Sequence, residues 1–246
     1  MITTSEGRTP NRYQAISLDS NYILKPLTND KKFVAFFDIL GFSNIVRETD
    51  IKVLSSTITK VLLPGIEDSV QGVYIPDKVK IFNVSDSIIL YTIDDSVNSC
   101  LLLLIACNKL MGTCLKIKFP LRGAIAYGEF IADDKHFVGT ALVDAVDYEK
   151  KQQWSGCLVT PNCTKTIKNS YDVSPNPLDS QTIHYQVPLK CGEYVEHYYA
   201  LRGWIDLIDD PDIDAKNYFP TLGNLRWEEL LKQRNTQQFI DFVKSR

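Results

Sequence analysis

The chain of 246 residues is 44% hydrophobic and 23% charged, with 12 glycines and 11 prolines. These proportions are typical of a globular protein and exclude a disordered chain, a collagen-like repeat and a fibre. The net charge of −3 indicates no general affinity for nucleic acid or for an anionic membrane, so we expect neither as a partner. Because no Gly-, Ser- or Pro-rich linker divides the sequence, we predict a polar arm over 1–30 and a single domain over 31–246.

The first predicted elements are a buried strand and a helix. Residues 33–37, FVAFF, form an unbroken apolar run that is typical of a central strand. The run ends at Asp38, and Gly41 marks a turn. Apolar residues then recur at helical spacing over 42–61, and the Pro-Gly pair at 64–65 is expected to stop this helix.

The next predicted elements are two strands, VKIFNV at 79–84 and IILYTI at 88–93, joined by a tight turn. The remaining predicted elements, in chain order, are an apolar helix over 97–115, a strand over 121–130, a hairpin return at 136–139, a helix over 142–153, a short strand over 156–160, a polar loop over 171–182, two strands within 183–204 and an amphipathic helix over 227–243.

The order strand–helix–strand–strand–helix–strand predicts an α+β fold of the split βαβ, or ferredoxin-like, type. We expect one sheet with its helices packed on one face. The core of this pattern covers residues 33–160, and 161–246 is a C-terminal extension.

The six cysteines form no CxxC pair and have no histidine at metal-ligand spacing. Cys100, Cys107 and Cys114 recur every seven residues in an apolar helix, which indicates core packing. The first residues are polar and lack the apolar run of a signal peptide. We therefore expect free thiols and a cytoplasmic location.

Two acidic residues are candidates for chemistry. Asp38 ends the apolar strand, and Asp86 lies in the turn between the two following strands. In a split βαβ sheet the first strand lies beside that hairpin, so both carboxylates can meet at one end of the sheet. Converging carboxylates repel each other unless a divalent cation lies between them, which suits Mg²⁺ or Mn²⁺ with phosphate oxygens. The alternative is a strand-end cap and a turn-forming aspartate.

The residues after Asp38 add an anion site to this interpretation. The backbone N–H groups of Gly41, Phe42 and Ser43 are expected at a helix N-terminus, where the dipole favours phosphate. A plain helix start has the same sequence pattern. Together with a metal pair, the segment suggests phosphoryl or nucleotidyl transfer.

Four segments in this order resemble a known family, the class III nucleotidyl cyclases. They are FFDILGFS, similar to the first metal strand and phosphate loop; KIFNVSDSIILY, similar to the hairpin with the second metal aspartate; LRGAIAYGEF, similar to the R-x-G-I-x-x-G strand; and VGTALVDAVDYE, similar to the helix that follows. The resemblance spans residues 33–153.

The resemblance implies a site for two divalent ions, Mn²⁺ or Mg²⁺, at Asp38, Ile39 and Asp86. It also implies that the substrate is a nucleoside triphosphate and that two head-to-tail protomers share each site. We therefore expect a homodimer.

Two departures from the family concern the base that is bound. Phe82 stands where purine cyclases have a base-reading Lys or Glu, and His136 stands where they have Asp or Cys. A phenyl ring cannot hydrogen-bond a purine edge, and base discrimination depends on such bonds. In this respect the chain resembles the pyrimidine cyclases of the bacterial Pycsar antiphage system, whose cyclic UMP or cyclic CMP activates a separate effector. Core packing for Phe82 and a surface hairpin position for His136 are the alternatives.

A third departure concerns the transition state. Val143 and Asp147 fall where the family has its Asn and Arg, and neither side chain can replace them. The candidates for a substitute cation are Arg122, Lys118 and Arg47, although Arg122 can equally be a structural ion-pair residue. Four further residues are candidates for lining the site or for helix packing: Tyr127, Glu149, Gln153 and Trp154.

The sequence therefore predicts a uridylate cyclase that converts UTP to 3′,5′-cyclic UMP and pyrophosphate, with catalytic residues Asp38, Asp86 and Arg122. Gly41, Phe42, Ser43, Phe82 and His136 are the predicted substrate-binding residues. A cytidylate cyclase, a purine cyclase and a catalytically inactive nucleotide-binding scaffold are the alternatives. A polymerase or a diguanylate cyclase is disfavoured, because the chain has no GGDEF-like hairpin and no basic nucleic-acid channel.

Overall fold

A computed structural model describes residues 30–71, 78–133, 136–170, 176–190, 198–208, 213–219 and 226–246. Nearly all of the predicted N-terminal arm, residues 171–175 and Cys191 lie outside the described residues. The prediction of a loop over 171–182 is wrong for its described part, because a short helix, α8, covers Pro177–Gln181.

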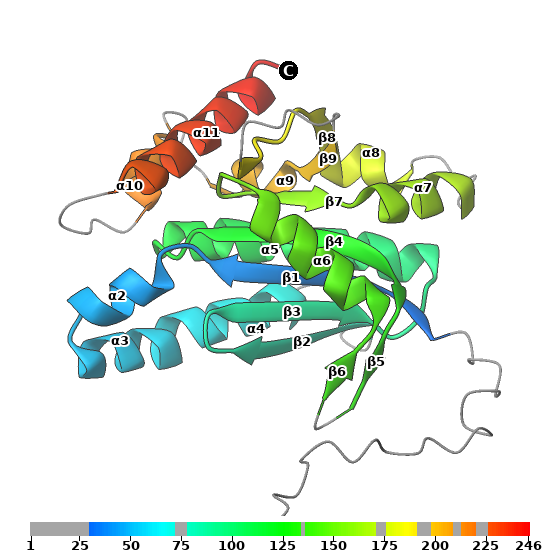
Figure 1. The fold of residues 1–246 in the computed structure, drawn as a ribbon, viewed down its shortest axis with the longest axis horizontal. Helices are drawn as coiled ribbons and strands as arrows, with labels where there is room; N and C mark the ends of the chain where they lie inside the picture. Colours follow the sequence, from blue (N-terminus) through cyan, green and yellow to red (C-terminus); the bar gives the residue numbers. More distant parts are fainter. Residues whose placement is uncertain are drawn as a thin grey trace, which may run out of the picture.

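A seven-stranded sheet forms the centre of the molecule, in the order β2-β3-β1-β4-β7-β9-β8 (Figure 1). Its first four strands pair antiparallel, and β7 joins β4 in parallel. The strands of the sheet are β1 Lys31–Ile39, β2 Val79–Val84, β3 Ser87–Thr92, β4 Leu121–Glu129, β7 Cys157–Val159, β8 Thr182–Tyr185 and β9 Tyr198–Leu201. A separate hairpin consists of β5 Ile131–Ala132 and β6 Phe137–Val138.

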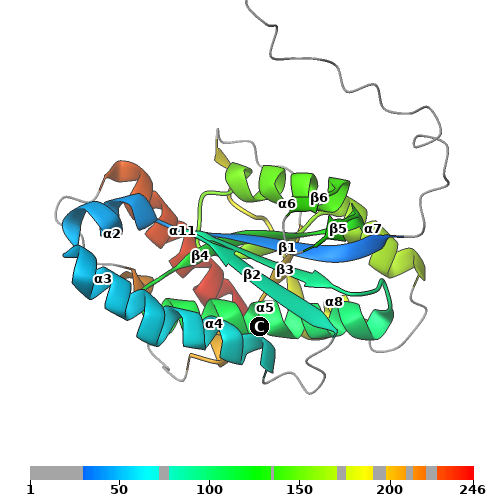
Figure 2. The same cartoon turned by 90° about the horizontal axis from the view of Figure 1, so that it is seen from below.

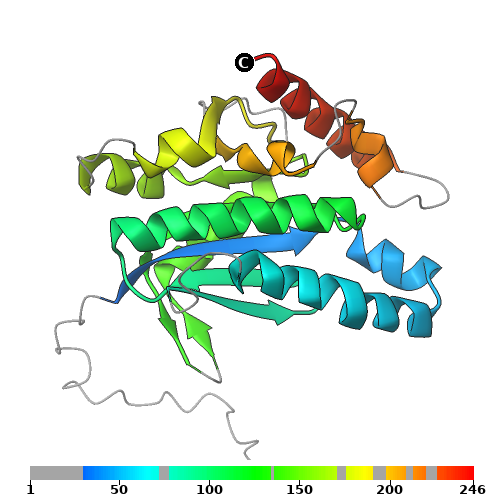
Figure 3. The same ribbon diagram turned by 180° about the vertical axis from the view of Figure 1, so that it is seen from behind.

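The order of β1 to β4 confirms the predicted α+β class and the split βαβ arrangement. On one face of the sheet lie α4 (Leu63–Gln71) and α5 (Val97–Lys116), as predicted (Figure 3). However, α6 (Thr140–Lys151) lies on the opposite face (Figure 2), so the helices are not confined to one side.

The composition of β1 explains why both faces are covered. Phe33, Ala35 and Phe37 are buried in the core on the α5 side. The intervening residue Val34 is buried too, in a second apolar cluster with Ala141 of α6. Successive side chains of a strand point to opposite faces, and a strand that is apolar throughout needs a cover on both.

The segment predicted as one helix over 42–61 contains breaks. It divides into α2 Phe42–Glu48, α3 Ile51–Thr57, a π-turn over Ile58–Leu62 and then α4. Asp50 starts α3 by accepting hydrogen bonds from the backbone N–H groups of Lys52 and Val53, at 2.9 and 3.1 Å.

The expected stop at residues 64–65 is wrong, because α4 continues through Pro64 and Gly65. Proline has no N–H group to donate, and the wider hydrogen-bond pattern of the preceding π-turn accommodates it without ending the helix.

The C-terminal extension belongs to the same core. Trp154, three residues after α6, packs edge-on against Phe239 at 4.7 Å between ring centroids, and Trp204 stacks on Phe239 at 6.1 Å. The two strands predicted within 183–204 and the helix predicted over 227–243 are present. The helices of the extension are α7 Pro161–Ser170, α8 Pro177–Gln181, α9 Gly203–Asp206, α10 Ala215–Tyr218 and α11 Trp227–Lys244.

Helix α5 is a core helix. By length and composition it is the one helix among the described residues that could cross a membrane, which is weak evidence, and 61% of its apolar window is buried inside the protein. Cys100, Cys107 and Cys114 lie on its buried side, which confirms the predicted core packing. All five described cysteines are free and buried.

Candidate functional site

The pairing of β1 with β3 brings Asp38 and Asp86 to the same end of the sheet. Asp38 lies opposite Ser87, the residue that follows Asp86 in the hairpin turn. The backbone N–H of Ile39 donates a 3.0 Å hydrogen bond to the carbonyl oxygen of Asp86. The predicted convergence of the two aspartates is therefore present in the fold.

The surroundings of Asp38 disfavour its negative charge. Burial, followed by the charge of Glu149 and more weakly that of Asp86, raises the pKa of the Asp38 carboxyl to about 6. The charges of Arg122 and Lys232 act in the opposite direction.

These residues fit a divalent cation. Carboxylate and carbonyl oxygens of Asp38, Asp86 and Ile39 are hard donors of the kind that Mg²⁺ and Mn²⁺ take. A bound cation would also relieve the repulsion around Asp38. No group of three or more His, Cys, Asp and Glu side chains forms a metal cluster in the part of the chain that the structure describes.

Arg122 is the buried cation of the site. It pairs with Asp38 across β1 and β4, and its Nη2 lies 3.6 Å from Oδ2 of Asp38. The same guanidinium forms a tight ion pair with the buried Glu149 of α6, and Nη1 donates to the carbonyl oxygen of Gln152 at 3.1 Å. The structural ion-pair role of Arg122 is therefore present, and its role as a substitute cation in the transition state stays a prediction.

The predicted anion loop starts α2. Gly41 has a left-handed backbone with φ of 76°, which favours glycine, and its carbonyl oxygen accepts the first helical bonds from Asn44 and Ile45. None of the N–H groups of Gly41, Phe42 and Ser43 donates a hydrogen bond within the described residues. They remain available to an anion.

Phe82 lies on the Asp38 side of the sheet. It pairs with Ile89 of β3, which pairs with Phe36, two residues before Asp38. Its side chain is 40% exposed, and its ring packs edge-on against Phe137 of β6 at 4.6 Å. One part of the Phe82 ring therefore packs against a neighbouring ring, and another part is accessible to solvent.

His136 precedes Phe137, so the β5–β6 hairpin carries it near Phe82. Its imidazole Nδ1 lies 3.0 Å from Oδ1 of Asp133, and the side chain is 58% exposed. This position matches the alternative in which His136 is an exposed residue of a surface hairpin. A contact between His136 and the substrate base stays a prediction.

The other predicted site residues divide into two groups. Glu149 contacts Arg122, and Gln153 lines a nearby cavity. In contrast, Tyr127 donates to Asp95 at 3.0 Å near the far end of β4, and Trp154 is buried against Phe239. Within the described part of the chain, no hydrogen bond or ion pair joins the Asp38 cluster to four exposed residues: Lys118, Arg47, Asp147 and Val143.

Two lysines near the site were missed by the sequence analysis. Lys232 of α11 is half-buried, and Lys190 follows β8. Burial, together with the positive charge of Arg122, lowers the pKa of each lysine. Neither belongs to a recognisable motif, and only the docking of the C-terminal extension brings them near Asp38.

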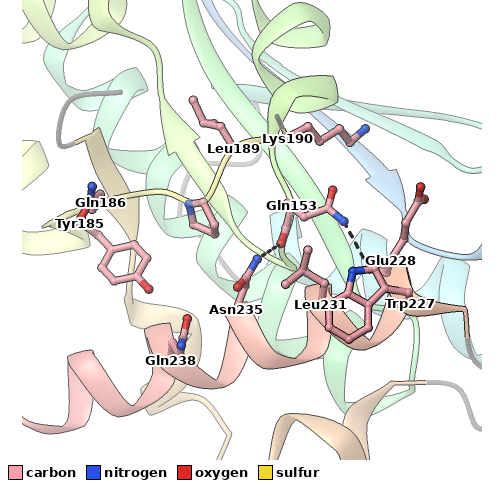
Figure 4. A pocket seen from close by; sticks show the side chains of 11 residues that line it. Gln153, Tyr185, Gln186, Leu189, Lys190, Trp227, Glu228, Leu231, Asn235 and Gln238 are labelled. Carbon is pink, nitrogen blue, oxygen red and sulfur yellow. Dashed lines mark hydrogen bonds between the residues drawn. The ribbon is translucent and has the colours of Figure 1, made fainter. Parts of the chain in front are cut away.

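A cavity of about 700 Å³ lies beside this cluster, between α11 and the segment after β8. Figure 4 shows Lys190 and Gln153 on one side and Trp227 and Leu231 of α11 on the other. The indole of Trp227 is 72% exposed. Lys190 lines this cavity, and the charge of Asp38 acts weakly on its ammonium.

No family model and no curated protein matches the chain. Solved structures of similar fold include the adenylyl cyclase CyaB from P. aeruginosa, at 15% identity and a TM-score of 0.44, covering 70% of this chain and 93% of that one. The catalytic core of a rhodopsin-guanylyl cyclase with converted specificity, in complex with ATPαS, has 16% identity and a TM-score of 0.48, covering 70% and 95%. A bacterial light-regulated adenylyl cyclase has 9% identity and a TM-score of 0.44, covering 72% and 94%. These structures give no support for a pyrimidine-cyclase subgroup.

Proposed function

We propose that the chain is a nucleotide cyclase that converts a pyrimidine nucleoside triphosphate, UTP ahead of CTP, to a 3′,5′-cyclic nucleotide and pyrophosphate. The observation that carries the proposal is the meeting of Asp38 and Asp86 at one end of the sheet, beside three free N–H groups of the 41–43 loop. Those residues stand at the matching positions of the cyclase motifs in the sequence.

In this proposal, Asp38, Ile39 and Asp86 hold two Mn²⁺ or Mg²⁺ ions. When bound, such ions supply the positive charge that lowers the pKa of the ribose 3′-hydroxyl and stabilises the departing pyrophosphate. The Gly41, Phe42 and Ser43 amides bind the β and γ phosphates. Arg122 holds Asp38 in place through its own ion pair with Glu149.

The substrate base is assigned from Phe82. Its half-exposed ring has no hydrogen-bonding group for a purine edge and offers a face on which a pyrimidine stacks. His136 is the second proposed base contact. A purine cyclase is the alternative, and competition between the four triphosphates separates the two.

We also propose a cytoplasmic homodimer, whose product acts on a separate effector in antiphage defence. Apolar side chains exposed around the site support the dimer, because such a surface favours a partner. They are Phe82 at 40%, Val84 at 54%, Val138 at 54% and Val143 at 59% exposure.

A specific observation favours one competing function, an inactive nucleotide-binding scaffold. Val143 and Asp147 of α6 replace the transition-state Asn and Arg of the cyclase motif, and Arg122 is already paired with Glu149. Such a protein would bind a triphosphate without turnover.

The test is product analysis by mass spectrometry after incubation with Mn²⁺ and each of ATP, GTP, CTP and UTP. We expect cyclic UMP from the wild type, none from Asp38→Ala, and normal yield from Asp68→Ala, an exposed acid on α4. Full activity of Asp38→Ala contradicts the metal assignment. No product from any of the four triphosphates contradicts the cyclase and favours the scaffold.

A further inference from the structure

Helix α11 is attached to the candidate site by several hydrogen bonds. At its first turn, Oε1 of Glu229 accepts a 2.7 Å bond from the side-chain amide of Asn44, the residue after the 41–43 loop. Two turns later, the Thr236 hydroxyl accepts a 2.8 Å bond from the backbone N–H of Ser155. The face of α11 that carries both residues is therefore held against α2 and the segment between α6 and β7.

Gln153 adds two further bonds to this attachment. Its side-chain amide donates to the carbonyl oxygen of Glu228 at 3.3 Å, and its own carbonyl oxygen accepts from Asn235 at 2.6 Å (Figure 4). The register of α11 along the site is thus determined on both sides of Lys232.

Lys232 lies between these attachment points. It is three residues after Glu229 and four before Thr236, which places all three side chains on one face of the helix. The bond between Glu229 and Asn44 of α2 brings this turn of α11 beside the 41–43 loop, so Lys232 lies on the part of the helix that adjoins the candidate site.

The Lys232 ammonium makes no hydrogen bond or ion pair with any residue that the structure describes. It is half-buried; Arg122 and Lys190 add positive charge around it, and Glu228 and Glu229 at the start of α11 add negative charge. Partial burial of a charge without a partner is costly, so this arrangement favours an anionic ligand.

We propose that Lys232 binds the polyphosphate chain of the substrate, from within the same protomer that holds Asp38 and Asp86. The identity of the ligand rests on the proposed cyclase function. Lys232 supplies a positive charge on the side of the site opposite the β2–β3 hairpin, next to the loop amides. This cation comes from the C-terminal extension and lies outside the four motif segments.

Inorganic tripolyphosphate is the probe, and calorimetric titration in the presence of Mn²⁺ measures its dissociation constant. Lys232→Met keeps most of the side chain and removes the charge. We expect it to weaken tripolyphosphate binding at least about tenfold, as for the loss of a charge-assisted hydrogen bond. Lys232→Arg should restore most of the affinity. Arg234→Met, an exposed cation on the same helix, is the matched control and should bind as the wild type does.

A structural role for Lys232 is distinguished by thermal melting without ligand. Since the unpartnered ammonium costs free energy in the folded protein, Lys232→Met should melt at the same or a higher temperature. A lower melting temperature together with unchanged tripolyphosphate affinity would overturn the proposal, as would an absence of tripolyphosphate binding by the wild type.

Kinetic measurements separate this proposal from the cyclase function. If the wild type cyclises a triphosphate, Lys232→Met should raise its KM at least about tenfold. If KM and tripolyphosphate affinity are both unchanged in Lys232→Met, the role of Lys232 is refuted, but the cyclase function is not. If no triphosphate is cyclised but tripolyphosphate binding still depends on Lys232, the phosphate site stands and the cyclase assignment fails.

Discussion

Asp38 and Arg122 face each other directly across β1 and β4, with 3.6 Å between Oδ2 and Nη2. The stronger partner of Arg122 is Glu149, which forms a tight ion pair with it from α6 on the same face of the sheet. The guanidinium thus connects the helix to the proposed metal ligand. A bound cation at Asp38 would compete with Arg122 for that carboxylate but not for Glu149.

The Arg122–Glu149 pair should be important for stability. Arg122→Met removes one partner and leaves the nearly inaccessible Glu149 carboxylate without its counter-ion, which typically costs about 3–5 kcal/mol. Urea denaturation monitored by Trp fluorescence measures this loss. The double variant Arg122→Met/Glu149→Leu should recover most of the stability, because the uncompensated charge is gone. A single variant as stable as the wild type would contradict this account.

The raised pKa of Asp38 predicts a pH dependence of stability in the metal-free protein. Its pKa is about 6 in the folded state, above the ordinary value of 3.8, so the folded state binds more protons between these values. The contribution of Asp38 to stability is therefore present below about pH 4 and is lost as the pH rises through 6.

Thermal melting in EDTA at pH 4.5 and at pH 7.5 checks this expectation. Asp38→Asn cannot ionise, so its melting temperature relative to the wild type should be higher at pH 7.5 than at pH 4.5. If the melting temperatures of Asp38→Asn and the wild type differ by the same amount at both pH values, the pKa of Asp38 is not raised.

Phe82 should affect base selection more than chemistry. Phe82→Ala removes the proposed stacking surface, which is worth about 1–3 kcal/mol per base. We expect a rise of about 5- to 150-fold in KM for the preferred triphosphate, a smaller change in kcat and weaker discrimination against purines. Ile51→Ala, which truncates a more exposed apolar side chain on α3, is the control. Unchanged base selectivity in Phe82→Ala would contradict the assignment of Phe82 to the base pocket.

The buried cysteines should be chemically inert in the folded protein. Burial raises the pKa of the Cys100 and Cys114 thiols to about 12, and the thiolate is the reactive form. Peptide mapping after iodoacetamide treatment should find the five described cysteines unlabelled in native buffer and labelled in urea. Rapid native labelling of Cys107 would contradict the packing of α5.

The sequence predicts the part of the site that is local along the chain. Asp38 ends an apolar strand and Asp86 lies in a tight turn, so hydrophobic patterning alone places both at element ends. The hairpin then brings them together, as the split βαβ order requires. Phe82 is similarly predicted, because the alternation along β2 determines which side of the sheet it occupies.

The contribution of Lys232 could not be predicted in this way. The apolar periodicity of α11 shows that it packs, but not on which element, and its bonds to Asn44 and Ser155 join residues far apart in sequence. The break at Asp50 was missed for a different reason. The apolar spacing continues across it, and only the capping bonds reveal a new helix.

The bond between Asn44 and Glu229 joins residues 185 positions apart. During synthesis, β1, the phosphate loop and the β2–β3 hairpin emerge from the ribosome long before α11 does. The aspartates can meet early, but the flank of the site that carries Lys232 forms only after residue 236 has been released and docked. A nascent or truncated chain would thus hold the two carboxylates and Arg122 without Lys232.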